Sequence, residues 1–189
     1  MRRTHAVGRD HPLRHFFTDI VRRRFDSDVR LPDPRLAAYI SGLLVDFTHV
    51  DNLYRIRDAG GPRLEDVGEM LLESNPLLEA ASFDRERAVR KHVGDYVLFM
   101  TGLFPESLSG GQRFRQMRLD VFVDYMKAGK ESYEVVSAFD QSEYRDEAPL
   151  FRKLAENFEL CVFGLNLVKE DLEKLQRAYL HGLRQAFEG

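Results

Sequence analysis

The chain has 189 residues, enough to bury one hydrophobic core, and 43% of them are hydrophobic, including 14 phenylalanines. This composition is typical of a folded globular protein and excludes a disordered chain. The net charge of −3 gives no field that would attract nucleic acid or an anionic membrane, so we expect neither as a partner. No apolar run approaches the ~18 residues that span a bilayer.

Cys161 is the single cysteine, and it lies in the apolar run 160–163. The chain can therefore form no internal disulfide and no cysteine-based zinc site. A lack of internal disulfides is typical of proteins of the reducing cytoplasm. We expect a soluble cytoplasmic protein in which residues 1–189 form a single helical domain.

Two helices are predicted near the N-terminus. In the first, Asp10 is placed to cap the helix and Pro12 lies in the opening turn. The apolar stripe of this helix is Leu13, Phe16, Phe17, Ile20 and Val21, and the helix should end near Phe25. In the second, Asp33 is the cap and Pro34 takes the first helical position, where the missing N–H of proline costs nothing. Its inward positions are Leu36, Ile40, Leu43 and Phe47.

Residues 84–104 predict a central buried helix, preceded by a short helix over about residues 64–74. At roughly 100° per residue, one face collects Val89, His92, Val93, Tyr96, Val97, Met100, Leu103 and Phe104. Leu98 points the opposite way, so the last two turns are apolar all round and must be covered on both sides. Gly102 and Pro105 mark the end of the helix, since proline cannot continue it.

The rest of the chain also has helical periodicity. One helical stretch is expected over about residues 113–139, either continuous or broken at Gly129. Residues 146–187 form either one long helix or two helices hinged near Gly164. The last part carries an apolar stripe, here called the C-terminal stripe, which consists of Val168, Leu172, Leu175, Tyr179, Leu183 and Phe187. Because no strand pattern competes, we predict an all-α fold, an irregular bundle of about six to eight helices.

Two Asp/His pairs border the apolar faces of two predicted helices. Asp46 and His49 are three residues apart in the second helix, and His92 and Asp95 are three apart in the central one, with Tyr96 next to them. A carboxylate beside a histidine fixes the histidine tautomer and raises its basicity. If the two helices pack together, these side chains could bind a small molecule or a metal, or act as acid and base. Structural histidines held by a nearby acid explain the same pattern.

A second candidate site is the glycine pair in the loop after the central helix. Residues 108–112 resemble the signature motif of ABC-transporter ATPases, but the chain has no Gly-x-x-x-x-Gly-Lys-Ser/Thr phosphate loop, so nucleotide hydrolysis is not predicted. The amides of Ser109, Gly110 and Gly111, with Arg113 beside them, could bind a phosphate or a carboxylate at a helix N-terminus. A Gly-Gly loop in which Ser109 caps the next helix is the simpler interpretation.

The sequence identifies no reaction and no cofactor, because no nucleophile, base and orienting group are marked out together. Our leading hypothesis is a non-catalytic protein that acts by self-association or by binding a partner. Its contact surface would be the C-terminal stripe, from Val168 to Phe187, for example in a homodimer, although the same stripe could instead close the core of its own chain. The alternatives are a small-molecule- or metal-binding enzyme with the site between the second and central helices, and anion binding at the glycine loop.

Overall fold

The computed structural model describes residues 11–53, 67–72, 83–106 and 115–188. These ranges contain helices and no strand, which confirms the predicted all-α class. In chain order the α-helices are α1 (Pro12–Arg24), α2 (Pro34–Asp46), α3 (Val50–Leu53), α4 (Val67–Leu72), α5 (Phe83–Leu103), α6 (Arg115–Ala138), α7 (Ala148–Glu156) and α8 (Phe158–Glu188). A π turn at Phe25–Val29 follows α1, and a 3-10 turn at Ser142–Tyr144 precedes α7.

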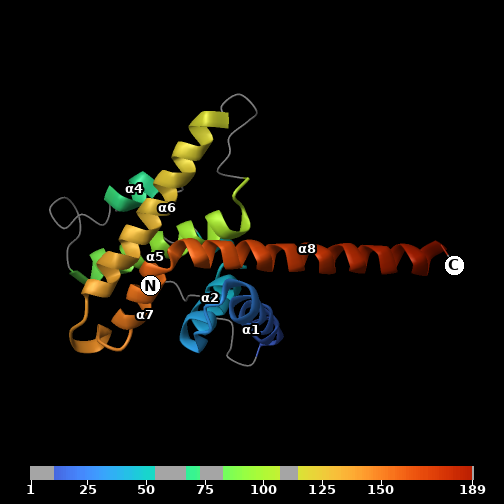
Figure 1. Ribbon diagram of the computed structural model, residues 1–189, viewed down its shortest axis with the longest axis horizontal. Helices are drawn as coiled ribbons and strands as arrows, with labels where there is room; N and C mark the ends of the chain where they lie inside the picture. The colour runs from blue at the N-terminus through green and yellow to red at the C-terminus, as the bar shows by residue number, and fades with distance from the viewer. Residues whose placement is uncertain (1–10, 54–66, 73–82, 107–114, 189) are drawn as a thin grey trace.

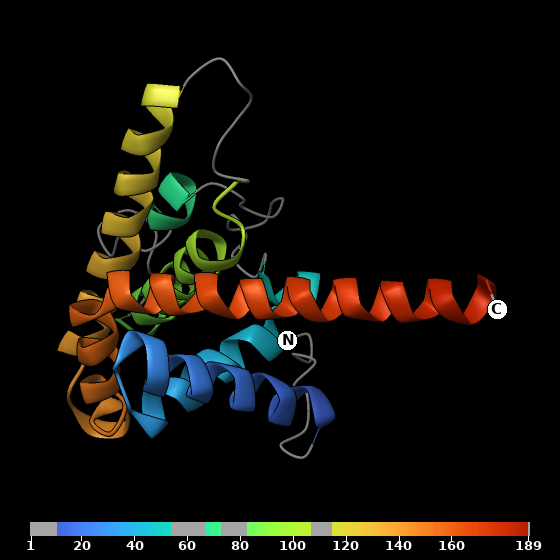
Figure 2. The same ribbon diagram turned by 45° about the vertical axis from the view of Figure 1, so that its right-hand side comes forward.

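The N-terminal part of α8 lies between two groups of helices (Figure 1). On one side α1 and α2 pack against each other, and on the other side α5 packs along α6. The short α7 packs on α6 and leads into α8. The view turned by 45° shows the same arrangement, and in both views the C-terminal part of α8 extends beyond all other helices (Figure 2).

Helix α5 is the central buried helix that the sequence predicts. It is covered by α6 on one side and by α8 on another, and Leu98, opposite the predicted inner face, is fully buried. The expectation that both sides of this helix are covered is therefore confirmed. Phe104 differs from its prediction, because the helix ends at Leu103 and the ring, just beyond the last turn, is 43% exposed.

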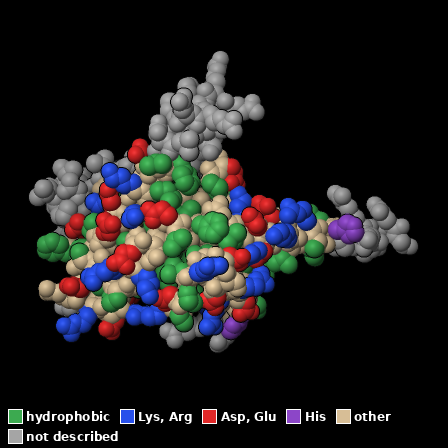
Figure 3. Space-filling model, viewed as in Figure 1, with side chains coloured by type: hydrophobic (Ala, Val, Ile, Leu, Met, Phe, Trp, Pro, Cys, Tyr) green, Lys and Arg blue, Asp and Glu red, His purple; other side chains and the backbone are tan. Residues whose placement is uncertain are grey.

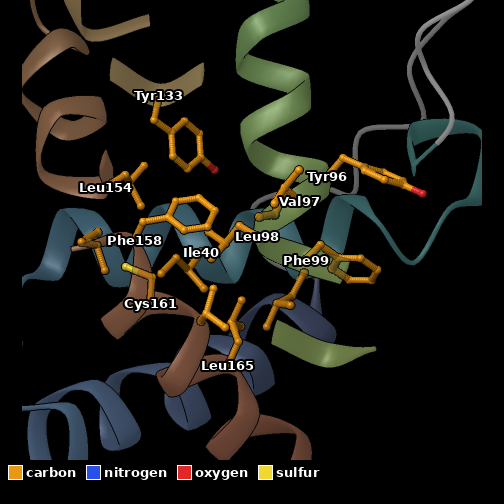
Figure 4. Packing of buried hydrophobic residues seen from close by; sticks show 14 of the residues in the cluster. Ile40, Tyr96, Val97, Leu98, Phe99, Tyr133, Leu154, Phe158, Cys161 and Leu165 are labelled. Atoms are coloured by element: carbon orange, nitrogen blue, oxygen red, sulfur yellow. The ribbon is translucent and has the colours of Figure 1, made fainter. Parts of the chain in front are cut away.

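The core lies where α2, α5, α6, α7 and α8 meet (Figure 4). The side chains labelled there are Ile40, Tyr96, Val97, Leu98, Phe99, Tyr133, Leu154, Phe158, Cys161 and Leu165, and all of them are buried. Full burial of one large apolar side chain contributes about 1.5–3 kcal/mol. The contacts among these five helices therefore set the position of α8 relative to the rest of the protein.

Each of the two N-terminal helices has a side-chain cap at its start, and that of α2 is the predicted one. The Asp33 carboxylate accepts hydrogen bonds from the amides of Arg35 at 2.9 Å and Leu36 at 3.1 Å, which confirms Asp33 as the cap of α2. At α1 the residue next to the first helical position is His11, whose Nδ1 accepts a bond from the Leu13 amide at 3.3 Å. The cap of α1 is therefore His11 and not the predicted Asp10, which lies outside the described residues.

Gly129 and Gly164, the two positions at which a helix break is one of the alternatives from sequence, lie inside continuous helices. A Cβ on Gly129 in α6 would lie 2.6 Å from the Phe158 ring, and one on Gly164 in α8 would lie 2.5 Å from the Phe25 ring. Glycine serves here to let a ring of another segment approach the helix closely. Residues 146–187 do form two helices, but the break between α7 and α8 is at Asn157 and not near Gly164.

The short helix expected over about residues 64–74 is found as α4, whereas α3 was not predicted. Over the described ranges, none of the helices combines the length and the apolar composition that a bilayer crossing requires.

Candidate functional site

The predicted Asp/His residues lie where α5 meets α2. Asp46 ends α2, and His49, just beyond it, is exposed to solvent. In α5, His92, Asp95 and Tyr96 are all buried. The structure therefore packs α5 against α2, as the hypothesis requires. Of the candidate residues, His49 is exposed to solvent, whereas the three in α5 are buried.

His92 lies among aromatic rings. Its imidazole centroid is 6.0 Å from the ring of Phe47, which follows the last residue of α2, and 6.4 Å from the ring of Tyr96. The ring of Phe47 also packs edge-on against Phe99 at 5.1 Å. This histidine is therefore part of the packing between the end of α2 and the middle of α5.

Asp95 is the centre of a buried polar cluster that joins three helices. Its Oδ1 accepts hydrogen bonds from the hydroxyl groups of Tyr39 in α2 and Tyr133 in α6, the latter at 2.8 Å. Its Oδ2 accepts one from Lys91 Nζ, one turn earlier in α5, at 2.8 Å. A carboxylate with three donors and a lysine charge beside it is well satisfied although it is buried.

The electrostatics of the cluster keep both tyrosines protonated. Burial raises the pKa of Tyr39 and of Tyr133 well above the ordinary value, and the negative charge of Asp95 raises the pKa of both hydroxyls further. Both hydroxyls are therefore hydrogen-bond donors at neutral pH. Because protein donors already occupy both oxygens of Asp95, the arrangement holds α2, α5 and α6 together.

Sequence reasoning did not place Tyr39 and Tyr133 at Asp95. They are 56 and 38 residues away in the chain, so only the packing of α2 and α6 on α5 brings them there. The one local signal is the spacing of Lys91 and Asp95, four residues apart on a helix. Within the described ranges, no group of three or more His, Cys, Asp and Glu side chains could hold a metal ion.

The second predicted site, the anion-binding loop at Ser109, Gly110, Gly111 and Arg113, lies outside the described residues. Nothing in the structure bears on it, and it stays a prediction.

An ion-pair cluster fixes α8 to α1. It lies at the edge of what we call the protein body, which consists of α1 to α7 and residues 158–171 of α8. Asp171 of α8 accepts hydrogen bonds from Arg23 Nη2 and from Arg24 Nε, each at 2.8 Å, and Arg24 Nη2 also contacts its second oxygen. Bonding to Arg24 is the main reason that the pKa of Asp171 falls to about 2, with Arg23 adding to the effect. Asp171 is therefore ionised at all but strongly acidic pH, and it marks the point where α8 leaves the body.

Beyond Asp171 the C-terminal stripe becomes exposed. Val168 is fully buried and Leu172 half-buried, but Leu175 is 50% exposed and Tyr179 68% exposed. Leu180, on the same side of the helix, is 48% exposed. The side chains of the predicted members Leu183 and Phe187 lie outside the described residues. We call residues 158–171 the docked half of α8 and residues 172–188 the projecting half.

Charges on the projecting half lie away from the C-terminal stripe. Lys174 pairs with Glu170 at 3.9 Å, and Arg177 pairs with Glu173 at 3.8 Å, each one turn apart along the helix. In Figure 3 charged side chains follow the upper edge of the projecting half and hydrophobic ones follow its lower edge, the side on which α1 lies in Figure 1. The projecting half is therefore amphipathic, with an apolar face that the described part of the chain does not bury.

Comparison with family models, curated proteins and solved structures gives no match for this chain.

Proposed function

We propose that this protein is a non-catalytic, self-associating protein whose contact surface is the C-terminal stripe on the projecting half of α8. The observation that carries the proposal is the continuity of one helix face. The same face buries Cys161, Leu165 and Val168 in the core and then carries Leu175 and Tyr179 into solvent. An amphipathic helix face of this length is typical of a surface that packs against another element.

A helix that projects alone is poorly stabilised in water. The projecting half is about 25 Å long at 1.5 Å per residue. Most of the stability of a helix in a protein comes from packing of its apolar face rather than from the intrinsic helix propensity of its residues. A partner that covers Leu175, Tyr179 and Leu180 would supply that packing and would remove a large apolar surface from water.

A second copy of the chain is the occupant that the charges favour. Over residues 170–177, at the start of the projecting half, the charged side chains form opposite-sign pairs within one helix, Glu170 with Lys174 and Glu173 with Arg177, so two copies bring no uncompensated like charges together. Nor does the exposed part of the C-terminal stripe, Leu175 and Tyr179, contain a charge that association would have to bury. Two-fold symmetric pairs are also the commonest form of homo-oligomer.

The available surface predicts association of moderate strength. Leu175, Tyr179 and Leu180 are about half to two-thirds exposed, and a fully buried side chain of this size contributes about 1.5–3 kcal/mol. Two copies supply these side chains twice, against a cost of about 4–15 kcal/mol for lost translational, rotational and side-chain freedom. The gain and the cost are of the same order, so association should be reversible and should depend on concentration, and the proposal takes a dissociation constant in the micromolar range. The proposal includes a reducing, cytoplasmic setting, which the buried free thiol of Cys161 supports.

Light scattering on the purified chain, with two matched substitutions, tests the proposal. The wild type should have twice the 22.0 kDa mass of the chain at roughly 100 µM, a concentration that suits a micromolar dissociation constant. Tyr179→Asp places a charge in the C-terminal stripe and should give a monomer. His181→Asp places the same side chain two residues on, about 200° around the helix, and should leave the dimer intact.

Both variants carry the same new residue on an exposed part of α8, so a general effect of aspartate on helix stability would act on both. A wild-type monomer at this concentration would refute the proposal. Equal masses for the two variants would also refute it, because association would then not depend on the C-terminal stripe.

A further inference from the structure

The face of α8 that is buried in the docked half is the face that carries the C-terminal stripe, since Cys161, Leu165 and Val168 are all fully buried. In the docked half this face packs on the rest of the protein. Leu165 lies so close to Gly102 of α5 that a Cβ added to the glycine would be 2.5 Å from the Leu165 side chain. Helical spacing puts Leu172, Leu175 and Tyr179 on the same face one turn after another.

This placement decides how two projecting halves can pack. In a parallel pair with the two stripes facing, both bodies would lie at the same end of the helices, and each would lie on the side of its partner. The two bodies would then need the same space. Sliding one helix along the other to separate the bodies would remove the contact between Leu175 and Tyr179 of the two copies. In an antiparallel pair the bodies lie at opposite ends, and the whole of each projecting half remains available.

We infer that two copies pair antiparallel through residues 172–188 of α8, so that the two bodies sit at opposite ends of a two-helix rod. The inference rests on the self-association proposed above and adds the orientation of the partner. With full overlap the two-fold axis passes near Leu180, the midpoint of residues 172–188. Tyr179 of each copy then lies next to the axis, and Leu175 lies about one turn from it.

The antiparallel pair also gives a role to an exposed apolar end of α1. Leu13 and Phe16, in the first turns of α1, are 40% and 38% exposed, although the sequence predicts them on the apolar stripe of that helix. In both ribbon views the N-terminal end of α1 points in the direction in which α8 projects (Figures 1 and 2). The C-terminal end of the second copy would arrive at this edge of the body, next to Leu172.

Spin labels at two exposed positions of α8 test the orientation by pulsed electron paramagnetic resonance. Glu170→Cys lies next to the body and Arg177→Cys lies near the proposed axis, and both side chains are more than half exposed. Cys161 is buried, and burial raises its pKa to about 12, so the native thiol should not take up label. Wild-type protein treated in the same way checks this.

In an antiparallel pair centred near Leu180, the two labels at position 170 should be clearly farther apart than the two labels at position 177, because their separation along the helix axis is about 20 Å larger at 1.5 Å per residue in each helix. A parallel pair would give nearly equal distances. A dimeric mass with equal distances would overturn the antiparallel inference and leave self-association standing. A monomeric mass would overturn both.

Discussion

The two halves of α8 carry the same kind of apolar face but differ in what covers it. In the docked half, Leu165 and Val168 are fully buried and Gly164 lets the Phe25 ring approach the helix backbone. In the projecting half, Leu175 and Tyr179 are half exposed or more. An amphipathic pattern therefore predicts that a helix face needs a partner, but it does not say whether that partner belongs to the same chain or to another one.

The two halves of α8 should contribute differently to stability. Side chains in the docked half should contribute to the free energy of unfolding of one chain, at any protein concentration. Those in the projecting half should contribute chiefly to association, so their effects should depend on concentration. Substitutions in the two halves should therefore separate effects on unfolding from effects on association.

Truncation of one leucine in each half should give the largest contrast. Leu165→Ala removes a fully buried side chain and should lower the free energy of unfolding by about 2–5 kcal/mol. Leu175→Ala, measured in dilute solution where the chain is monomeric, should lower it by less than about 1 kcal/mol, because the side chain is already half exposed. Urea unfolding followed by circular dichroism measures both. Equal losses in the two variants would contradict the division of α8 into a docked and a projecting half.

A methyl group at a glycine of the docked half should have the next largest effect. Gly164→Ala would place a Cβ 2.5 Å from the Phe25 ring, and the overpacking should cost about 1–3 kcal/mol. Gly42→Ala in α2 is the control, because its Cβ would meet only the end of the Arg14 side chain at 3.4 Å. Alanine there should be neutral or should stabilise the helix by up to about 1 kcal/mol. A thermal melt that shows no loss for Gly164→Ala would mean that the ring can move aside.

The boundary between the halves should show a pH dependence. The pKa of Asp171 is lowered from 3.8 to about 2 in the folded chain, so its bonds to Arg23 and Arg24 stabilise the fold above its unfolded pKa and lose their effect as pH falls towards the folded value. Asp171→Asn should therefore destabilise the protein at neutral pH by a smaller amount, on the order of 1 kcal/mol. The difference between wild type and variant should shrink as pH falls from about 4 to 2. A difference that is constant over this range would show that the ionised form of Asp171 has no special role.

Local features of the fold could be predicted because they depend on neighbours in the sequence. Asp33 caps α2 through amides two and three residues away, and the buried face of α5 follows from a period of 3.6 residues. For a related reason, the sequence left open whether the helices break at Gly129 and Gly164. Gly129 and Gly164 look like helix breaks in isolation, and only the rings of Phe158 and Phe25, far away in the chain, explain why glycine is required.

The candidate sites show the same limit. The sequence placed Asp95 beside His92 at the edge of an apolar face, but Tyr39 and Tyr133 come to this carboxylate from two other helices. No pattern within α5 contains that information. The C-terminal stripe, by contrast, could be read from its spacing, while its exposure beyond Leu172 depends on where the body ends.

Hydrogen exchange followed by mass spectrometry at several protein concentrations compares the two halves of α8 most directly. Amides of the docked half, 158–171, should be protected at every concentration, since the core covers them. Amides of the projecting half, 172–188, should be protected near 100 µM and should lose protection on dilution below roughly 1 µM, as expected for a dimer of micromolar affinity. Projecting-half exchange that stays equally fast at all concentrations would contradict self-association through this helix.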